Sequence, residues 1–177
     1  MSSPQFTPYL DALTEAMKVL MEDPSTIFIG QQIVYYGNPM SKTIEGLPKE
    51  RMIETPVMEE TQMGMTIGLA MTGRKVVSFY PRWDFLICAT NQLVNHLDKI
   101  KIMSDGGYKP KVIIRTSIGS QRPLHPQHQH IADFTPGFKA LCDTVDIIRL
   151  DEPHQIFESY KYSYERTDNR STILVEW

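Results

Sequence analysis

The stretch from Glu54 to Gly73, with the sequence ETPVMEETQMGMTIGLAMTG, constrains the fold of this chain more than any other. Pro56 cannot donate a backbone hydrogen bond and pushes the residue before it towards extended geometry, so a strand should end here and a helix should begin just after. Good helix formers follow, and Gly73 is placed to end the helix. Gly64 and Gly68 each cost roughly 1 kcal/mol relative to alanine inside a helix. They therefore indicate that another backbone or a ligand packs closely on that face.

Two carboxylates, Glu59 and Glu60, fall in the first turn of this expected helix. A helix N-terminus is partially positive, so acidic side chains are stabilised there. The ordinary interpretation is that both are solvated acids at a helix start. Glu59, however, lies at a strand-to-helix corner, which is where open α/β sheets bind ligands. It is therefore a candidate site residue.

Expected strands alternate with expected helices along the whole chain. This order predicts an α/β fold: a single three-layer domain over residues 1–177, with a mostly parallel sheet and helices on both faces. Asp151 is expected to cap the last helix, and residues 1–6 are expected to be loose. The expected strands are 26–30, 51–53, 75–80, 111–116, 145–150 and 172–176, and the expected helices, besides the one that ends at Gly73, are 9–21, 84–103, 138–142 and 153–166.

Composition excludes several classes of function. The net charge is -3 and no basic block occurs, which argues against nucleic-acid binding as the main activity. No apolar run is long enough to span a bilayer, and the first residues do not resemble a signal peptide. The two cysteines, Cys88 and Cys142, have no metal-type spacing and are expected to be buried thiols. We therefore expect a cytoplasmic protein.

The tract from Ser117 to Pro136 reads as a loop and carries His125, His128 and His130. Three interpretations compete: metal ligands, acid–base groups in a cleft, or plain surface histidines. The metal interpretation is the weakest, because this spacing in a loop matches no common ligand signature. Histidine titrates near neutral pH, so a loop with three of them suits proton transfer to or from a polar substrate.

Other catalytic motifs are missing from the sequence. The glycines of the expected helix have the wrong spacing for a dinucleotide loop, and neither a Walker loop nor a GxSxG elbow occurs. Residues 31–50 form an irregular connection, whose length in a compact domain indicates a functional or partner-ordered loop. The aromatic residues of Trp83-Asp84-Phe85 follow the third expected strand. Their default role is core packing, and a ring there can also stack on a heteroaromatic ligand.

Several stretches, in order and with near gapless spacing, resemble the pyrimidine-binding domain of the beta subunit of thiamine-diphosphate-dependent 2-oxoacid dehydrogenases, the pyruvate dehydrogenase type. The resemblance covers nearly the whole chain and implies the transketolase-like, thiamine-diphosphate-binding fold. No single motif decides it. The stretches that carry it are Asp23–Gly30, Glu54–Glu59, Trp83–Phe85, Asn91–Val94, Met103–Gly107, Val112–Arg115 and, less well, His128–His130.

The resemblance implies thiamine diphosphate as the cofactor and a role for each matched residue. Glu59 resembles the glutamate that hydrogen-bonds a ring nitrogen of the aminopyrimidine, which favours the imino form that takes a proton from the thiazolium carbon. Phe85 resembles the ring that stacks on the pyrimidine, and His128 resembles the histidine that faces the substrate. Gln31 is assigned to the cofactor side of the site. The neighbouring histidines, at 125 and 130, are weaker candidates for substrate binding.

Some residues depart from the family pattern. Met58, Glu60 and Thr61 are larger or charged where small residues surround the family's glutamate. The acidic residues that usually follow the first strand's glycine are replaced by Gln31 and Gln32, which puts proton communication between paired active sites in doubt. His130 stands where glutamine is usual, so the histidine loop matches least well.

The chain is also short for the family, because beta subunits continue into a second domain. We expect this C-terminal transketolase domain to be absent, and no GDG…N magnesium motif is present. A separate alpha-type diphosphate-binding subunit would then hold the diphosphate and Mg²⁺, with self-association as well, for example as an α₂β₂ assembly. Gly64 and Gly68 would permit close helix packing across it. Two alternatives stay open: a non-catalytic assembly or regulatory paralogue, and a transketolase-like half-subunit that handles sugar phosphates.

Overall fold

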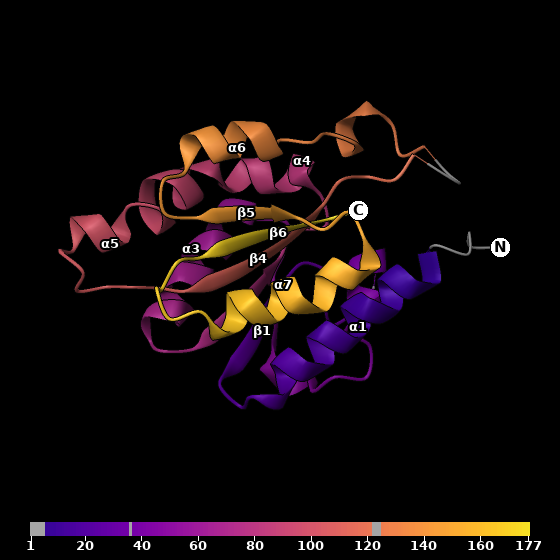
Figure 1. Cartoon of the computed structure of the whole chain (residues 1–177), viewed down its shortest axis with the longest axis horizontal. Helices are drawn as coiled ribbons and strands as arrows, with labels where there is room; N and C mark the ends of the chain where they lie inside the picture. Colours follow the sequence, from indigo (N-terminus) through magenta and orange to yellow (C-terminus); the bar gives the residue numbers. More distant parts are fainter. Residues whose placement is uncertain (1–5, 36, 122–124) are drawn as a thin grey trace.

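A six-stranded, fully parallel sheet forms the centre of the molecule in the computed structural model, which describes residues 6–35, 37–121 and 125–177 (Figure 1). The strand order is β2-β1-β3-β4-β6-β5. Both faces of the sheet are covered, so the predicted three-layer α/β domain is confirmed. The strands are β1 (Thr26–Gly30), β2 (Met52–Glu54), β3 (Lys75–Phe79), β4 (Val112–Ser117), β5 (Asp146–Arg149) and β6 (Thr172–Glu176).

Helices α1 and α7 lie side by side over one face, and α3, α4 and α6 cover the other (Figure 1). Short 3₁₀ segments join several of these elements. The helical segments are α1 (Phe6–Glu22), α2 (Pro39–Lys42), η1 (Lys49–Arg51), α3 (Glu59–Met71), α4 (Trp83–Leu86), η2 (Ile87–Ala89), η3 (Gln92–Leu97), α5 (Ile100–Met103), η4 (His128–His130), α6 (Thr135–Leu141) and α7 (Pro153–Glu165). Residues 1–5 of the tract predicted to be loose lie outside the described residues, and α1 already begins at Phe6.

Two hydrophobic cores fill the spaces above and below the sheet, because successive side chains of a strand point to opposite faces. Ile113 and Leu174 pack towards α1 and α7. Ile114, Ile173 and Val175 pack towards α3, α4 and α6. Strands buried on both faces read as continuous apolar runs, which is why these segments could be recognised in the sequence.

The helix predicted over 84–103 is wrong as a single element. The structure breaks it into α4, the 3₁₀ turn η2, a π-helical turn at η3 and α5. Within the wide turn the Asp98 backbone N–H donates to the carbonyl oxygen of Leu93 at 2.9 Å. The Asp98 carboxylate is buried and accepts backbone N–H bonds from Thr144 and Val145 at 2.6 and 3.1 Å. Asp98 thus joins the end of this π-helical turn to the segment between α6 and β5.

Two further expectations are wrong. Asp151 does not cap α7: it pairs with Arg149 at 2.7 Å, while the Gln155 side chain accepts the backbone N–H groups of Asp151 and Glu152. Glu152 is therefore the N-cap residue. Cys88 is exposed on the outer side of η2 rather than buried, and Cys142 is half-buried.

The parallel arrangement brings the carboxyl ends of all six strands to one edge of the sheet. Residues far apart in sequence meet there, including the segments that follow β1, β2, β3 and β4 and the last residues of β6. The N-terminal end of α1 reaches the same side of the molecule, close to the C-terminus (Figure 1). No helix among the described residues is long and apolar enough to cross a membrane.

Candidate active site

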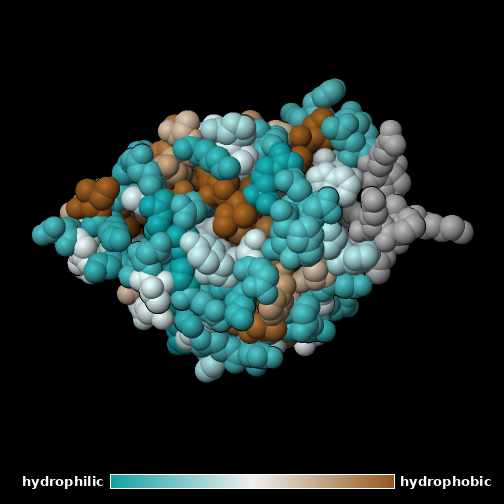
Figure 2. All heavy atoms as spheres, viewed as in Figure 1, coloured by the Kyte–Doolittle hydropathy of each residue, from teal (hydrophilic) through white to brown (hydrophobic). Residues whose placement is uncertain are grey.

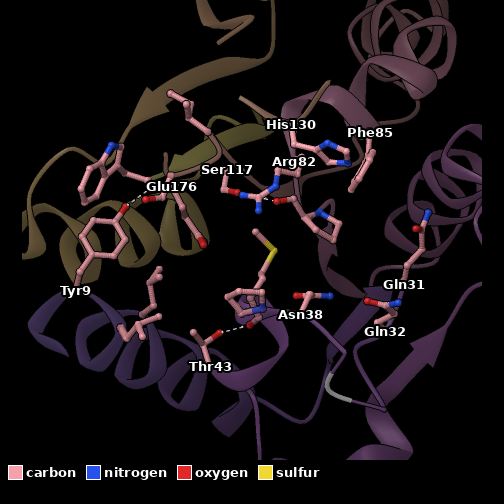
Figure 3. A pocket seen from close by; sticks show the side chains of 18 of the residues that line it. Tyr9, Gln31, Gln32, Asn38, Thr43, Arg82, Phe85, Ser117, His130 and Glu176 are labelled. Atoms are coloured by element: carbon pink, nitrogen blue, oxygen red, sulfur yellow. Dashed lines mark hydrogen bonds between the residues drawn. The ribbon is translucent and has the colours of Figure 1, made fainter. Parts of the chain in front are cut away.

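A cleft of about 480 Å³ lies at the carboxyl edge of the sheet (Figure 3). Its walls come from α1, the loop after β1, the start of α3, the loops after β3 and β4 and the end of β6. Open α/β sheets bind ligands at this edge, because the connections between strands and helices leave a crevice there. The cleft therefore lies where the sequence predicted a site.

The turn after β1 directs Gln31 into one wall of the cleft. Glu54 holds this turn: its carboxylate accepts the backbone N–H groups of Gln32 and of Val34, the latter at 2.8 Å. Gln32 has a φ of 56°, the left-handed region that such a tight turn requires. Gly30 permits the close approach to β3, since a Cβ there would lie 2.7 Å from the Cβ of Phe79. Gln31 is only 8% exposed and lines the cleft.

Glu59 is the first residue of α3, is half-buried and lines the cleft. The Tyr80 hydroxyl donates to its backbone carbonyl at 3.3 Å. The buried Gln62 amide, one turn later, donates to the Phe79 carbonyl at 2.9 Å and accepts from the Thr55 hydroxyl at 3.1 Å. These bonds tie the start of α3 to the ends of β2 and β3. The backbone that carries Glu59 is therefore fixed at the edge of the cleft.

Phe85 and His130 share a second wall (Figure 3). Both side chains are half-buried, and their rings meet edge to face with centroids 5.6 Å apart. Gly119 permits this arrangement, because a Cβ there would collide with the His130 carbonyl oxygen. Asp84 accepts the Ala132 backbone N–H at 3.4 Å and so tethers the end of the histidine loop. Nδ1 of His130 is buried and lacks a hydrogen-bond partner among the described residues.

The structure thus brings Gln31, Glu59, Phe85 and His130 together, but it does not bring the other two predicted histidines to the cleft. His125 and His128 are exposed, lie outside the cleft lining, and face each other with ring centroids 5.8 Å apart. The described residues contain no cluster of three or more histidine, cysteine or acidic side chains suited to a metal ion.

A buried ion pair, which was not predicted from the sequence, lies next to the cleft, and its acidic member Glu176 lines the cleft. Arg115 at the end of β4 and Glu176 at the end of β6 pair through two bonds, Nε to Oε1 at 2.6 Å and Nη2 to Oε2 at 3.0 Å. Arg115 also donates to Thr43 at 3.0 Å, and the Tyr160 hydroxyl donates to Glu176. Burial opposes the charge on Arg115, but the Glu176 carboxylate and Tyr160 raise its pKa above the usual value. The sequence signal that could have revealed this ion pair was the presence of opposite charges near the ends of two strands that prove to be neighbours.

Arg82, which follows β3, also lines the cleft and was not predicted from the sequence. Its side chain is half-buried, lines the cleft and lies between Ser117 and His130 (Figure 3). Burial lowers the pKa of Arg82, and the nearby charge of Asp84 only partly opposes this. The sequence signal was position alone: Arg82 comes three residues after a strand whose carboxyl end faces the site.

Hydrophobic side chains are exposed beside the cleft and elsewhere on the surface. Val57 and Met58, which precede Glu59, are 77% and 49% exposed, and Met65 of α3 is also exposed. Nothing among the described residues lies within 4 Å of a Cβ built at Gly68, so this face of α3 is open. Figure 2 shows another hydrophobic group at the α5 end, where Ile102 and Met103 are exposed.

Comparison with known proteins identifies a family model that matches almost the whole chain. The model describes the pyrimidine-binding domain of transketolase and matches residues 7–176. Among curated proteins, the pyruvate dehydrogenase E1 component subunit beta of Chaetosphaeridium globosum is 31% identical over 170 residues, covering 86% of this chain and 51% of that protein. The 2-oxoisovalerate dehydrogenase subunit beta of Bacillus subtilis (strain 168) is 30% identical over 115 residues, covering 63% of this chain and 35% of that protein.

A solved structure has the same fold. It is titled "Split gene transketolase, inactive beta4 tetramer", superposes with a TM-score of 0.67 at 15% identity, and covers 95% of this chain and 48% of that chain. At this identity the likeness concerns the fold alone. The present chain spans about half the length of the curated pyruvate dehydrogenase relative described above.

Proposed function

We propose, because this chain belongs to the family of transketolase pyrimidine-binding domains, that it supplies the pyrimidine-binding part of a thiamine-diphosphate-dependent enzyme that decarboxylates a 2-oxo acid. One observation carries the proposal: the side chain of Glu59 lines a cleft at the carboxyl edge of the sheet, together with the ring of Phe85. Relatives named as beta subunits of pyruvate and 2-oxoisovalerate dehydrogenases support the reaction class.

The residues of the cleft fit an aminopyrimidine ring. Phe85 offers a half-buried aromatic ring, which can stack on a flat heterocycle. Glu59 offers a carboxylate that can share a proton with a ring nitrogen, and Gln31 offers an amide with both a donor and an acceptor. The cofactor, when bound, supplies the stabilisation of negative charge that decarboxylation requires. The chain itself orients the ring, holds one proton at Glu59 and limits the access of water.

The histidine loop is the candidate for contact with the substrate. His130 lines the cleft beside Phe85, and its enclosed Nδ1 has no partner among the described residues, so we assign to it the position that faces the substrate. The role predicted for His128 requires a loop conformation that turns this exposed side chain inward, and it stays a prediction. Histidine side chains are common general acids and bases, so an imidazole at either position suits proton transfer with the substrate.

A second polypeptide completes the site in this proposal, as an alpha-type subunit that holds the diphosphate and Mg²⁺. The exposed Val57 and Met58 beside Glu59 and the open face of α3 at Gly68 support a protein partner on this side. Relatives named as beta subunits, and a structural neighbour titled as a split-gene transketolase, support a divided enzyme. Self-association of this chain within such an assembly is part of the proposal.

The proposal is tested by replacing Glu59 with glutamine in a complex with a diphosphate-binding subunit encoded in the same genome. Turnover of pyruvate and of 2-oxoisovalerate is measured with thiamine diphosphate and Mg²⁺. We expect Glu59→Gln to lose at least about 100-fold in kcat, because proton transfer by a positioned side chain contributes on this scale. Glu60→Gln is the matched control: Glu60 lies on the same turn, is exposed and bonds only Asn91 among the described residues.

The outcome that contradicts the proposal is equal turnover by wild type and Glu59→Gln. A stable complex that binds the cofactor but turns over neither 2-oxo acid in the wild-type form would favour the alternative of a non-catalytic assembly subunit. The large residue Met58 and the charged Glu60 beside the glutamate are the observations that keep this alternative open.

A cytoplasmic location is also a proposal. It rests on two free cysteines, one exposed and one half-buried, which suit a reducing compartment. A related beta subunit from Oryza sativa is named as chloroplastic, so the family does not decide the compartment. Fractionation with an antibody against the chain would measure it.

A further inference from the structure

Arg82 is a half-buried cation that has no partner among the described residues. Its guanidinium points into the cleft between Ser117 and His130 (Figure 3). It makes no hydrogen bond or ion pair with any described residue. Taking a guanidinium out of water is costly when nothing replaces the lost hydrogen bonds, and the lowered pKa of Arg82 has this cause. Such a group is either a defect in packing or half of an interaction with a ligand.

Most other described arginines have hydrogen-bond or ion-pair partners for their guanidinium groups. Arg115 pairs with Glu176, Arg166 with Asp146 and Asp168, and Arg170 with Asp146. The half-buried Arg51 donates to the backbone carbonyls of Asp23 and Met21 at 2.8 and 2.6 Å, and Arg149 pairs with Asp133 and Asp151. An unpaired guanidinium at the mouth of the cleft is therefore an exception to the pattern of the described chain.

Two of the acids near Arg82 are engaged elsewhere, and the third acid of the cleft, Glu59, forms no ion pair with Arg82 among the described residues. Asp84 is the closest in sequence, yet its carboxylate accepts the backbone N–H of Ala132 and forms no ion pair with Arg82. Glu176 also lines the cleft but is bound by Arg115 and Tyr160. The Ser117 hydroxyl donates to the carbonyl of Pro81 at 2.6 Å, which fixes the backbone just before Arg82. The backbone at Arg82 is thus held in place, but no described residue supplies a negative charge that pairs with its guanidinium.

We propose that Arg82 binds an anionic group of the substrate, a carboxylate or a phosphate, and thereby restricts this site to acidic substrates. The inference rests on the proposed function, in which the partner subunit holds the diphosphate of the cofactor, so that the substrate is the remaining anion near this wall. A planar guanidinium binds either group through two parallel hydrogen bonds. The specificity follows from desolvation: a neutral analogue would leave Arg82 buried and unpaired, which costs binding energy.

The first test uses the ¹⁵N-labelled full chain alone. The side-chain Nε–Hε signal of Arg82 is assigned by its loss in Arg82→Lys, and it is followed while pyruvate, inorganic phosphate or the neutral ester methyl pyruvate is added at constant ionic strength. We expect a saturable shift with pyruvate or phosphate and none with the ester. Saturation by pyruvate at the lower concentration assigns a carboxylate substrate, and saturation by phosphate at the lower concentration assigns a phosphorylated one. The Nε–Hε signal of Arg74, which is exposed outside the cleft, is the internal control.

The second test uses the complex with the partner subunit. Arg82→Gln is expected to raise the KM of the acidic substrate at least about tenfold, the scale of a lost hydrogen bond to a charged group. Cofactor affinity should be unchanged, Arg82→Lys should recover part of the loss, and Arg74→Gln should behave as wild type. No anion-dependent shift of the Arg82 signal, an equal shift with methyl pyruvate, or an unchanged KM in Arg82→Gln would each overturn the inference. Failure of the proposed function is distinguishable, because Glu59→Gln leaves the anion-induced shift intact.

Discussion

Removing the Glu176 carboxylate is predicted to cost this fold a large part of its stability. Arg115 is 0% exposed and Glu176 is 4% exposed, and the two are joined by bonds of 2.6 and 3.0 Å. The Arg115 guanidinium also lies 4.7 Å from the centroid of the Phe79 ring, so water cannot replace the lost carboxylate on that side. Glu176→Ala therefore leaves a buried positive charge and removes the acceptor of the Tyr160 hydroxyl.

The expected loss is about 3–5 kcal/mol, the range for breaking a buried ion pair by removing one partner. This is a large fraction of the roughly 5–15 kcal/mol that a folded domain has in total. For a chain of this size it corresponds to a fall in Tm of about 6–20 °C. Urea unfolding followed by fluorescence measures it, because Trp83 is fully buried and reports on the core.

Two controls make the reasoning refutable. Glu158→Ala, on the exposed side of α7, should change the free energy of unfolding by less than about 0.5 kcal/mol. The double variant Arg115→Met with Glu176→Leu should be more stable than either single substitution, because an apolar pair leaves no buried charge. A loss below about 1 kcal/mol in Glu176→Ala, or simple additivity in the double variant, would show that the charge is not held in a dry environment.

Two further predictions concern pH and the histidine loop. The bidentate hydrogen bond from Arg166 holds the pKa of Asp168 at about 2, below its ordinary value, so this carboxylate stabilises the fold at neutral pH and the contribution fades as the pH falls below about 4. Asp168 is about half exposed, so Asp168→Asn should cost less than about 1 kcal/mol at pH 7 and less again at pH 3 in urea unfolding; a larger cost at pH 3 would reverse the sign of the argument. In the assembled enzyme, His130→Ala should lower kcat at least about tenfold with cofactor affinity retained, whereas His128→Ala should do so only if the loop turns inward; full activity in His130→Ala would remove that residue from the site.

The strand-to-helix corner before α3 was predictable from local chemistry. Pro56 ends β2 because it restricts the residue before it, and the first residue of α3 is Glu59, as the sequence indicated. The central strands were found for a similar reason, since strands covered on both faces are largely apolar. The family resemblance is confirmed by the match over residues 7–176 and by the pyruvate dehydrogenase relatives.

The π-helical turn at η3 and the missing counter-charge of Arg82 could not be predicted in this way. The turn serves Asp98, whose partners Thr144 and Val145 lie more than forty residues away in the chain. In the sequence, Arg82 looks like any arginine that follows a strand. It is half-buried only because other segments of the chain surround it in the fold. The spacing of the histidines likewise did not reveal which one faces the cleft, because Gly119 and Asp84 set that choice through tertiary contacts.

In the proposed function, assembly and chemistry meet at the rim of the cleft. Val57 and Met58 are exposed immediately before Glu59, so a protein surface that covers these two side chains also excludes water from the carboxylate. A hydrogen bond from Glu59 to a ring nitrogen is stronger in that drier environment, because a lower local dielectric strengthens polar contacts. Val57→Asp should therefore weaken both the complex and its turnover, whereas Ile102→Asp, at the distant α5 end, should leave both unchanged. If Val57→Asp turned over substrate at the wild-type rate, the contact with the partner would not be needed to exclude water from Glu59, and the argument would be wrong.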